Sequence, residues 1–238
     1  EVVHFIAAAM QFKDVVFNRW SHSNHHTWTV ITEKDLEVPV RRPVKFYKVI
    51  INFIGLEKGY GSIKVLVLHS LGIVTDKAKM VVPEEDHKRM FFWARMALLT
   101  HIAAIGLAIG FQSWLPVLFW GLPRFSGNFV LWPFVLAQHA GLAENVWDHR
   151  LSTRTVIVNP VLSYLYMDMQ YHLEHHLYPT VPFHRLRDMH ERVKDQLPPA
   201  YKGMWDVFRE MMPALIRQRK DADYCIKRPL PEKEKAVA

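Results

Sequence analysis

The sequence predicts an all-α protein, with membrane helices and a cytoplasmic helical cap that carries clusters of histidine. Long apolar segments recur along the 238 residues, of which 50% are hydrophobic. Within these segments the apolar residues recur at helical spacing rather than in alternation. The mean hydropathy of −0.03 lies between that of a soluble enzyme and that of a polytopic bundle. A substantial polar part must therefore accompany the membrane helices.

The first third of the chain is expected to be helical on both sides of a loop. Residues 2–20 have helical spacing and suit either the end of a membrane helix or a segment at its interface. Residues 29–43 carry charges and two prolines, so we expect a loop. Residues 44–55 predict an amphipathic helix, which suits an interfacial and an ordinary surface position equally. Residues 62–74 are apolar and of uncertain type.

The strongest membrane signal runs from Phe91 to Phe111. A membrane span needs roughly 20 apolar residues, and Arg95 lies near one end, where its side chain can extend to the interface. Residues 114–137 are also apolar, but Pro and Gly residues interrupt them, so one kinked span or a hairpin is expected. Clusters of basic residues before the span favour a cytoplasmic location for those loops. They are Arg41, Arg42, Lys45, Lys48, Lys77, Lys79, Lys88 and Arg89.

Past residue 159 the chain becomes more polar. Residues 160–177 predict a helix that ends before Pro179 and Pro182, and residues 183–197 predict an amphipathic helix. We expect one domain over residues 1–200. Residues 201–238 are expected to form a charged, mobile tail.

Charge and cysteine content exclude several classes of protein. The net charge of +7 suits anionic lipid headgroups or an acidic protein partner. Nucleic acid is disfavoured as a partner, because the basic residues are spread among apolar helices rather than gathered into one block. The single cysteine, Cys225, excludes a disulfide within the chain and a cysteine-ligated iron–sulfur cluster.

Seven of the fourteen histidines fall into three tight groups. Residues 22–26 and 172–176 both read His-x-x-His-His. Positions i, i+3 and i+4 share one face of a helix, so each group would present three imidazoles in one direction. Glu174, inside the second group, is expected to point away from that face. The third group is His139 alone, in the sequence Gln-His-Ala-Gly-Leu at the end of an apolar segment.

This pattern indicates a metal site with more than one ion. Imidazole suits zinc, iron, copper and nickel. A structural zinc site closes at about four ligands, whereas two facing groups would supply six nitrogens. The His-Glu-x-x-His string of zinc hydrolases does not occur.

These motifs resemble the membrane fatty acid desaturase and hydroxylase superfamily. Residues 169–179 look like the last histidine box of that family, and residues 18–27 look like its middle box. Residues 144–155 are similar to a bacterial branch of fatty acid desaturases or hydrocarbon oxygenases. The resemblance covers roughly residues 1–200.

The resemblance implies an oxidoreductase of lipid metabolism that binds two iron ions and uses O2 as its co-substrate. It would desaturate or hydroxylate a fatty acyl chain. The protein would be an integral, multi-pass membrane protein whose histidine boxes lie on the cytoplasmic side. Ferredoxin, rubredoxin or a b-type cytochrome with its reductase would be the external electron donor. The implied metal ligands are His22, His25, His26, His139, His172, His175 and His176, and no catalytic residue beyond them is expected.

Two alternatives remain open from the sequence. A monooxygenase of the same kind could hydroxylate an alkane, a terpenoid or another small hydrophobic molecule. A membrane protein without enzymatic activity could bind zinc or copper through the same histidines. The family also has an earlier His-x(3–4)-His box, which does not precede His22 here. We therefore expect an incomplete fragment that lacks about two ligands and binds iron weakly.

Four further residues are candidates for orienting the ligands. Metal-bound histidines usually donate their second N–H to a carboxylate or carbonyl. Asp168, Glu144 and Asp148 could accept such a bond, although pairing with Arg150 or Arg154 is an equal alternative. His149 is expected to support the ligands rather than bind metal. His184 and His190 are interpreted as ordinary helix residues.

Overall fold

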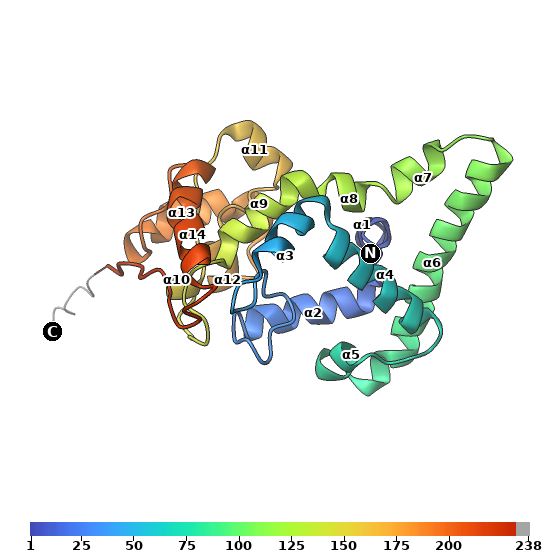
Figure 1. Cartoon of the computed structure of the whole chain (residues 1–238), viewed down its shortest axis with the longest axis horizontal. Helices are drawn as coiled ribbons and strands as arrows, with labels where there is room; N and C mark the ends of the chain where they lie inside the picture. The colour runs from blue at the N-terminus through green and yellow to red at the C-terminus, as the bar shows by residue number, and fades with distance from the viewer. Residues whose placement is uncertain (232–238) are drawn as a thin grey trace. The chain divides into compact units, whose positions relative to one another are not determined.

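The structure is a computed structural model, and it describes residues 1–231. The chain divides into two compact units (Figure 1). The first unit comprises Glu1–Thr27 and Tyr47–Pro133, and the second comprises Trp28–Phe46 and the chain from Phe134 onward. Every regular element within residues 1–231 is a helix, and the β-structure described there consists of two isolated bridges. The prediction of an all-α protein is confirmed.

The first unit is built from helices that pack around α6. Its helices are α1 (Val2–Met10), α2 (Val15–Thr27), α3 (Phe46–Ile51), η1 (Asn52–Ile54), α4 (Leu56–Ser70), α5 (Asp76–Val81), η2 (Glu84–Asp86), α6 (His87–Gly110), α7 (Leu115–Trp120) and α8 (Pro123–Ser126). Helix α9 (Asn128–His139) begins in this unit and ends in the second. Helices α1, α2 and α4 contact α6. Gly55, the last residue of the predicted amphipathic segment, has a left-handed φ of 67° that ends it.

The segment predicted as one helix over residues 2–20 is two helices. Phe12 has a φ of 55°, which ends α1. Asp14 then begins α2, since its Oδ1 accepts a hydrogen bond of 2.7 Å from the backbone N–H of Phe17. The other oxygen of Asp14 lies 2.8 Å from Nδ1 of the buried His69, whose Nε2 lies 3.0 Å from Oγ1 of Thr75. This buried chain of polar groups ties α2, α4 and α5 together.

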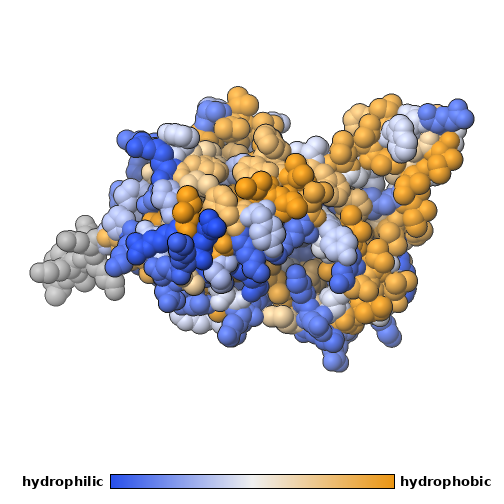
Figure 2. Space-filling model, viewed as in Figure 1, coloured by the Kyte–Doolittle hydropathy of each residue, from blue (hydrophilic) through white to orange (hydrophobic). Residues whose placement is uncertain are grey.

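Helix α6 has the side-chain distribution of a helix that faces lipid. The stretch Glu84–Gly110 is long and apolar enough to cross a membrane, by its length and composition. Its buried stripe is Met90, Ala94, Ala97, His101 and Ala104, which are mostly small residues at heptad spacing. Large apolar residues point outward instead, and Ile102 is 55% exposed. Figure 2 shows such apolar side chains gathered over α6 and α7.

The apolar region after α6 forms short helices rather than one span. Helix α7 is followed at Pro123 by α8, and α9 begins at Asn128. Pro133 lies inside α9, where it removes one backbone hydrogen bond. The long apolar helix α6 therefore stands alone as a candidate span within residues 1–231.

The second unit is made of short helices joined by ordered loops. They are α10 (His149–Ser152), α11 (Pro160–Leu165), α12 (His172–Leu177), η3 (Phe183–Arg185), α13 (Leu186–Val193), η4 (Lys194–Gln196) and α14 (Met204–Arg217). The helix predicted over residues 160–177 is interrupted, because Met167 and Asp168 both have a φ of 52°. Asp tolerates this left-handed conformation better than most residues. Helix α12 therefore starts afresh at the histidine group.

Part of the segment predicted as a mobile tail is helical and packed. Helix α14 buries Val207, Met211, Ala214 and Leu215, which recur at helical spacing. Ile226, beyond the helix, packs with Ala214 and Leu142. Apolar burial thus outweighs the local charge in this part of the chain. The last residues of the predicted tail, 232–238, lie outside the described residues.

Candidate metal centre

Three buried histidines of the second unit bring their ring nitrogens together. His172 and His176 stand one turn apart on α12, and His139 is the last residue of α9. Nε2 of His172 lies 3.1 Å from Nε2 of His139 and 3.1 Å from Nε2 of His176. All three residues are buried. The family resemblance implies His139 as a ligand together with the histidines of residues 172–176, and the structure brings their nitrogens together.

The outer nitrogens of this cluster are held by oxygen atoms. Nδ1 of His139 lies 2.9 Å from the carbonyl oxygen of Ser152, so this nitrogen carries the proton. Neutral His139 therefore turns an Nε2 lone pair toward the cluster. Nδ1 of His176 lies 3.0 Å from Oγ1 of Thr29. Histidines that bind metals are held in this way, by a hydrogen bond at the nitrogen away from the metal.

The cluster fits a transition-metal ion. Metal–imidazole bonds of about 2.0–2.1 Å place neighbouring nitrogens about 3 Å apart around one ion, and the two separations match this. The three ligand atoms lie within 4.8 Å of one another. Their donor set is nitrogen only, which suits iron, zinc or copper and not calcium or magnesium. His139, His172 and His176 are therefore able to hold one ion.

The other histidines of this unit lie beside the cluster. The ring of His175 is 5.7 Å from that of His172 and 5.8 Å from that of His176. His172 and His176, four residues apart on α12, therefore direct their Nε2 atoms to one point, while His175 points elsewhere. His149 stacks at a tilt beside His176, with their ring centroids 5.4 Å apart. This position beside a candidate ligand agrees with the supporting role expected for His149.

In the first unit, helix α2 repeats the arrangement of α12. Nε2 of His22 and Nε2 of His26 lie 3.3 Å apart, which again matches two ligands of one ion. His25 is buried, and its ring centroid is 6.0 Å from those of both neighbours. Both His-x-x-His-His groups thus form on helices as predicted. Each presents a close i, i+4 pair rather than three nitrogens at one point.

The carboxylates predicted to orient the ligands make other contacts. Within the described residues, Glu144 pairs with Arg42, whose Nε is 3.1 Å away, and Asp148 pairs with Arg150 at 2.8 Å. Asp168 accepts hydrogen bonds from Ser163 and Gln170. Arg150 holds the pKa of Asp148 below its usual range. The alternative of salt-bridge partners is therefore correct for Asp148, while the partner of Glu144 was not anticipated.

A carboxylate within the second histidine group, residues 172–176, makes buried contacts that the sequence did not predict. Glu174 points away from the ligand face, as predicted, and is fully buried. Its Oε1 accepts from Nδ1 of His190 at 2.5 Å, and its Oε2 accepts from Oγ1 of Thr155 at 2.6 Å. His190 was interpreted as ordinary. Its place between Leu186 and Val193 on the buried stripe of α13 was the available signal, since a polar residue at a core position needs a buried partner.

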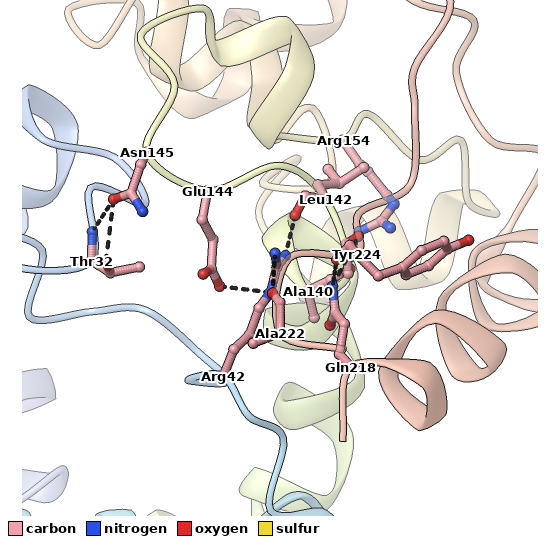
Figure 3. Close-up of polar contacts among 11 residues, drawn as sticks. Thr32, Arg42, Ala140, Leu142, Glu144, Asn145, Arg154, Gln218, Ala222 and Tyr224 are labelled. Carbon is pink, nitrogen blue, oxygen red and sulfur yellow. Dashed lines mark hydrogen bonds and ion pairs between the residues drawn. The ribbon is translucent and has the colours of Figure 1, made fainter. Parts of the chain in front are cut away.

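The segment after His139 is fixed by a network of polar contacts (Figure 3). The guanidinium of Arg42 donates to the carbonyl oxygen of Leu142 and pairs with Glu144. Nη1 of Arg154, a fully buried residue, donates to the carbonyl oxygen of Ala140 at 2.8 Å. Gly141 has a φ of 83°, and a Cβ there would come within 3.2 Å of Ile226. This network fixes the backbone that carries His139.

Replacing Arg42 with methionine is expected to destabilise the fold by about 3 kcal/mol, since it leaves a buried carboxylate without its charged partner. The side chains of Arg42 and Glu144 are only 9% and 14% exposed. Burial raises the pKa of Glu144, and Arg42 is the main opposing charge. Thermal unfolding in detergent measures the change. The matched control is Arg185→Met, which breaks an exposed pair with Asp188 and should cost less than about 1 kcal/mol. Equal effects of the two substitutions would show that the Arg42 pair is not structural.

A small cavity lies beside the cluster. It has a volume of about 10 Å³ and is lined in part by His172, Arg154, Gln170 and Tyr166. This space holds about one water molecule. It is too small for an alkyl chain, so the cavity is not the substrate site.

The fold and the site define a helical protein with an apolar helix of membrane-spanning length and histidine groups suited to transition metals. The chain belongs to the fatty acid desaturase family, whose sequence profile matches residues 2–208. The family assignment expected from the histidine motifs is thereby confirmed. Neither the curated proteins nor the solved structures gave a match to the chain.

Proposed function

We propose that this protein is an O2-dependent, membrane-bound oxidoreductase that binds two iron ions and desaturates or hydroxylates a fatty acyl chain. The observation that carries the proposal is the convergence of Nε2 of His139, His172 and His176 in a buried site of a fatty acid desaturase family member. The proposed ligands are these three residues together with His22, His25, His26 and His175. They comprise three histidines of the first unit and four of the second.

The protein supplies the position and protonation of the ligands. The carbonyl of Ser152 holds the proton on Nδ1 of His139, so that its Nε2 is a lone-pair donor. Thr29 orients His176 through Nδ1. Bound iron would supply O2 activation, and the protein's task is to keep the nitrogens aligned and buried away from water.

The overall reaction balances with an external reductant. In a desaturation, O2 takes two hydrogen atoms, which carry two electrons and two protons, from adjacent carbons of the alkyl chain. A reductant supplies two more electrons, solvent supplies two protons, and the products are an alkene and two waters. In a hydroxylation the same inputs give an alcohol and one water. An external one-electron carrier such as ferredoxin, rubredoxin or a b-type cytochrome is required in both cases.

We propose that the protein is integral to the membrane, with its histidine groups on the cytoplasmic side. Helix α6 supports this location, because its outward side chains are large and apolar. Lys77, Lys79, Lys88 and Arg89 lie before or within its first turn and favour that end as cytoplasmic. A multi-pass topology would require further spans besides α6.

Metal content and product together test the proposal. The protein is purified in detergent, its iron, zinc and copper are counted per chain, and the fatty acids of producing cells are analysed. We expect iron, rather than zinc or copper, as the bound metal and an unsaturated or hydroxylated acyl product. Stoichiometric zinc or copper without O2 consumption would contradict the proposal and favour the non-enzymatic alternative. Iron with an oxidised alkane or terpenoid would retain the chemistry and change the substrate.

A further inference from the structure

A pair of tryptophans in the second unit joins the molecular surface to the candidate metal centre. Trp147 is 70% exposed, and its ring lies 5.3 Å from that of Trp28. Trp28 is followed in the chain by the buried Thr29, whose Oγ1 lies 3.0 Å from Nδ1 of His176. An exposed indole is thus connected to a candidate iron ligand by one ring contact, one peptide unit and one hydrogen bond.

The loop that carries Trp147 is fixed against the segment that carries Trp28. Asn145 adopts a left-handed φ of 57°, which Asn accepts more readily than most residues with a side chain. Its backbone N–H donates to the carbonyl of Val30 at 3.0 Å. Its Oδ1 accepts from the backbone N–H of Thr32 at 3.0 Å and from Oγ1 of Thr32 at 3.2 Å (Figure 3). Such a conformation persists where its surroundings determine it, and it clusters at functional sites.

The surface around the pair is suited to an acidic protein. Nζ of Lys34 lies 3.4 Å from the centre of the ring of the half-buried Trp28, which places a positive charge beside the tryptophan pair. The chain as a whole carries a net charge of +7. Exposed tryptophans are the residues most enriched among the strong contributors to protein interfaces. Opposite charge on the partner would speed their encounter.

We propose that Trp147 and Trp28 form the surface that receives electrons from an acidic one-electron carrier protein, and that Trp28, Thr29 and His176 connect it to the metal. The inference rests on the proposed function, which requires two electrons from outside per turnover. Two reduced carriers would dock in succession, and each would give one electron. The carriers leave oxidised, and the electrons end in the reduction of O2.

A lipid surface is the rival occupant, because tryptophans are also common at membrane interfaces. The setting of this pair favours a protein. Trp28 precedes the polar loop of residues 29–43, and Trp147 is followed by the Asp148–Arg150 ion pair. An interfacial anchor needs an apolar face alongside its indoles.

The test compares Trp147→Ala with Trp205→Ala in iron-loaded protein. Trp205 is 74% exposed on α14 of the same unit, so it controls for the loss of a surface indole. Ferredoxin and rubredoxin are the probes. Carrier binding is measured by fluorescence anisotropy, and oxidation of the reduced carrier is followed at its own absorbance. We expect Trp147→Ala to weaken carrier binding about tenfold, as for a central interface tryptophan. Trp205→Ala should leave binding unchanged.

Substitutions at Thr29 distinguish docking of the carrier from transfer of its electron. Thr29→Val removes the hydroxyl and should slow carrier oxidation per bound iron while carrier binding stays the same, and Thr29→Ser should restore the rate. Turnover driven by dithionite should be the same in Trp147→Ala as in the unaltered protein. That result would show that iron binding and the chemical reaction are intact in the variant. If unaltered protein holds no iron, the proposed function itself fails.

Three results would overturn the inference while leaving the proposed function in place. The first is that neither carrier binds the unaltered iron-loaded protein. The second is that the Trp147→Ala variant binds and oxidises the carrier like the unaltered protein. The third is that Trp147→Ala weakens binding to phosphatidylserine vesicles and leaves carrier oxidation unchanged, which would make the pair a lipid anchor.

Discussion

Replacing His172 with alanine is expected to lower the affinity for iron by more than about 100-fold, which is the upper range for losing a residue that only orients a ligand. The reason is the central position of His172. Its Nε2 lies 3.1 Å from that of His139 and 3.1 Å from that of His176, so its removal leaves two nitrogens where three converged. Oxidation of the fatty acyl substrate should fall to background.

The iron content of the purified protein checks this prediction, together with the helical circular dichroism of each variant. His184→Ala is the matched control, because His184 is exposed and lies in η3, a short distance beyond α12 in the same unit. The His184→Ala variant should bind as much iron as the unaltered protein. An iron content in His172→Ala equal to that of the control, with folding intact, would mean that this cluster is not a metal site.

The parts of the site that sequence could predict are those fixed by local geometry. The spacing of His172 and His176 places both side chains on one face of any helix, and α12 forms over those residues. The same holds for His22 and His26 on α2. The expectation for His139 came from the family resemblance of the sequence around it, and α9 ends at this residue.

Features that depend on distant contacts were not predictable from spacing. The interruption at Met167 and Asp168 follows from two successive left-handed residues, and neither is a glycine that would announce a turn. Asp168 lies in this interruption, where its carboxylate accepts hydrogen bonds from Ser163 and Gln170. Helix α14 was missed because its charged neighbours obscured the apolar stripe from Val207 to Leu215.

The contact between Glu174 and His190 is the clearest example of a feature that sequence spacing could not predict. Sixteen residues separate them, and helices α12 and α13 must pack before the two side chains meet. The sequence correctly placed Glu174 away from the metal face, but it offered no partner for it there. Because a buried carboxylate must be paired, the buried face of α13 was the place to search for one.

Replacing Glu174 with alanine is expected to destabilise the protein by about 2–6 kcal/mol, because each of two buried donors loses its acceptor at a cost of about 1–3 kcal/mol. Glu174 is fully buried, and its two oxygens accept hydrogen bonds from His190 and Thr155. The substitution leaves both donors in the core without an acceptor. Glu174→Gln keeps the shape and one acceptor, so its cost should be smaller. Thermal unfolding of the metal-free protein measures these effects.

The same substitution should also weaken iron binding, by about 10–100-fold. Glu174 lies between His172 and His175 on α12, so the contact with His190 holds the helix that presents the ligands. A double-mutant cycle with Glu174→Gln and His190→Phe separates this coupling from simple loss of packing. If the two substitutions add without coupling, the pair does not act as a unit. If iron affinity is unchanged in every variant that folds, α12 is held by its apolar contacts through Leu173 with Val193 and Leu197, and the carboxylate serves stability alone.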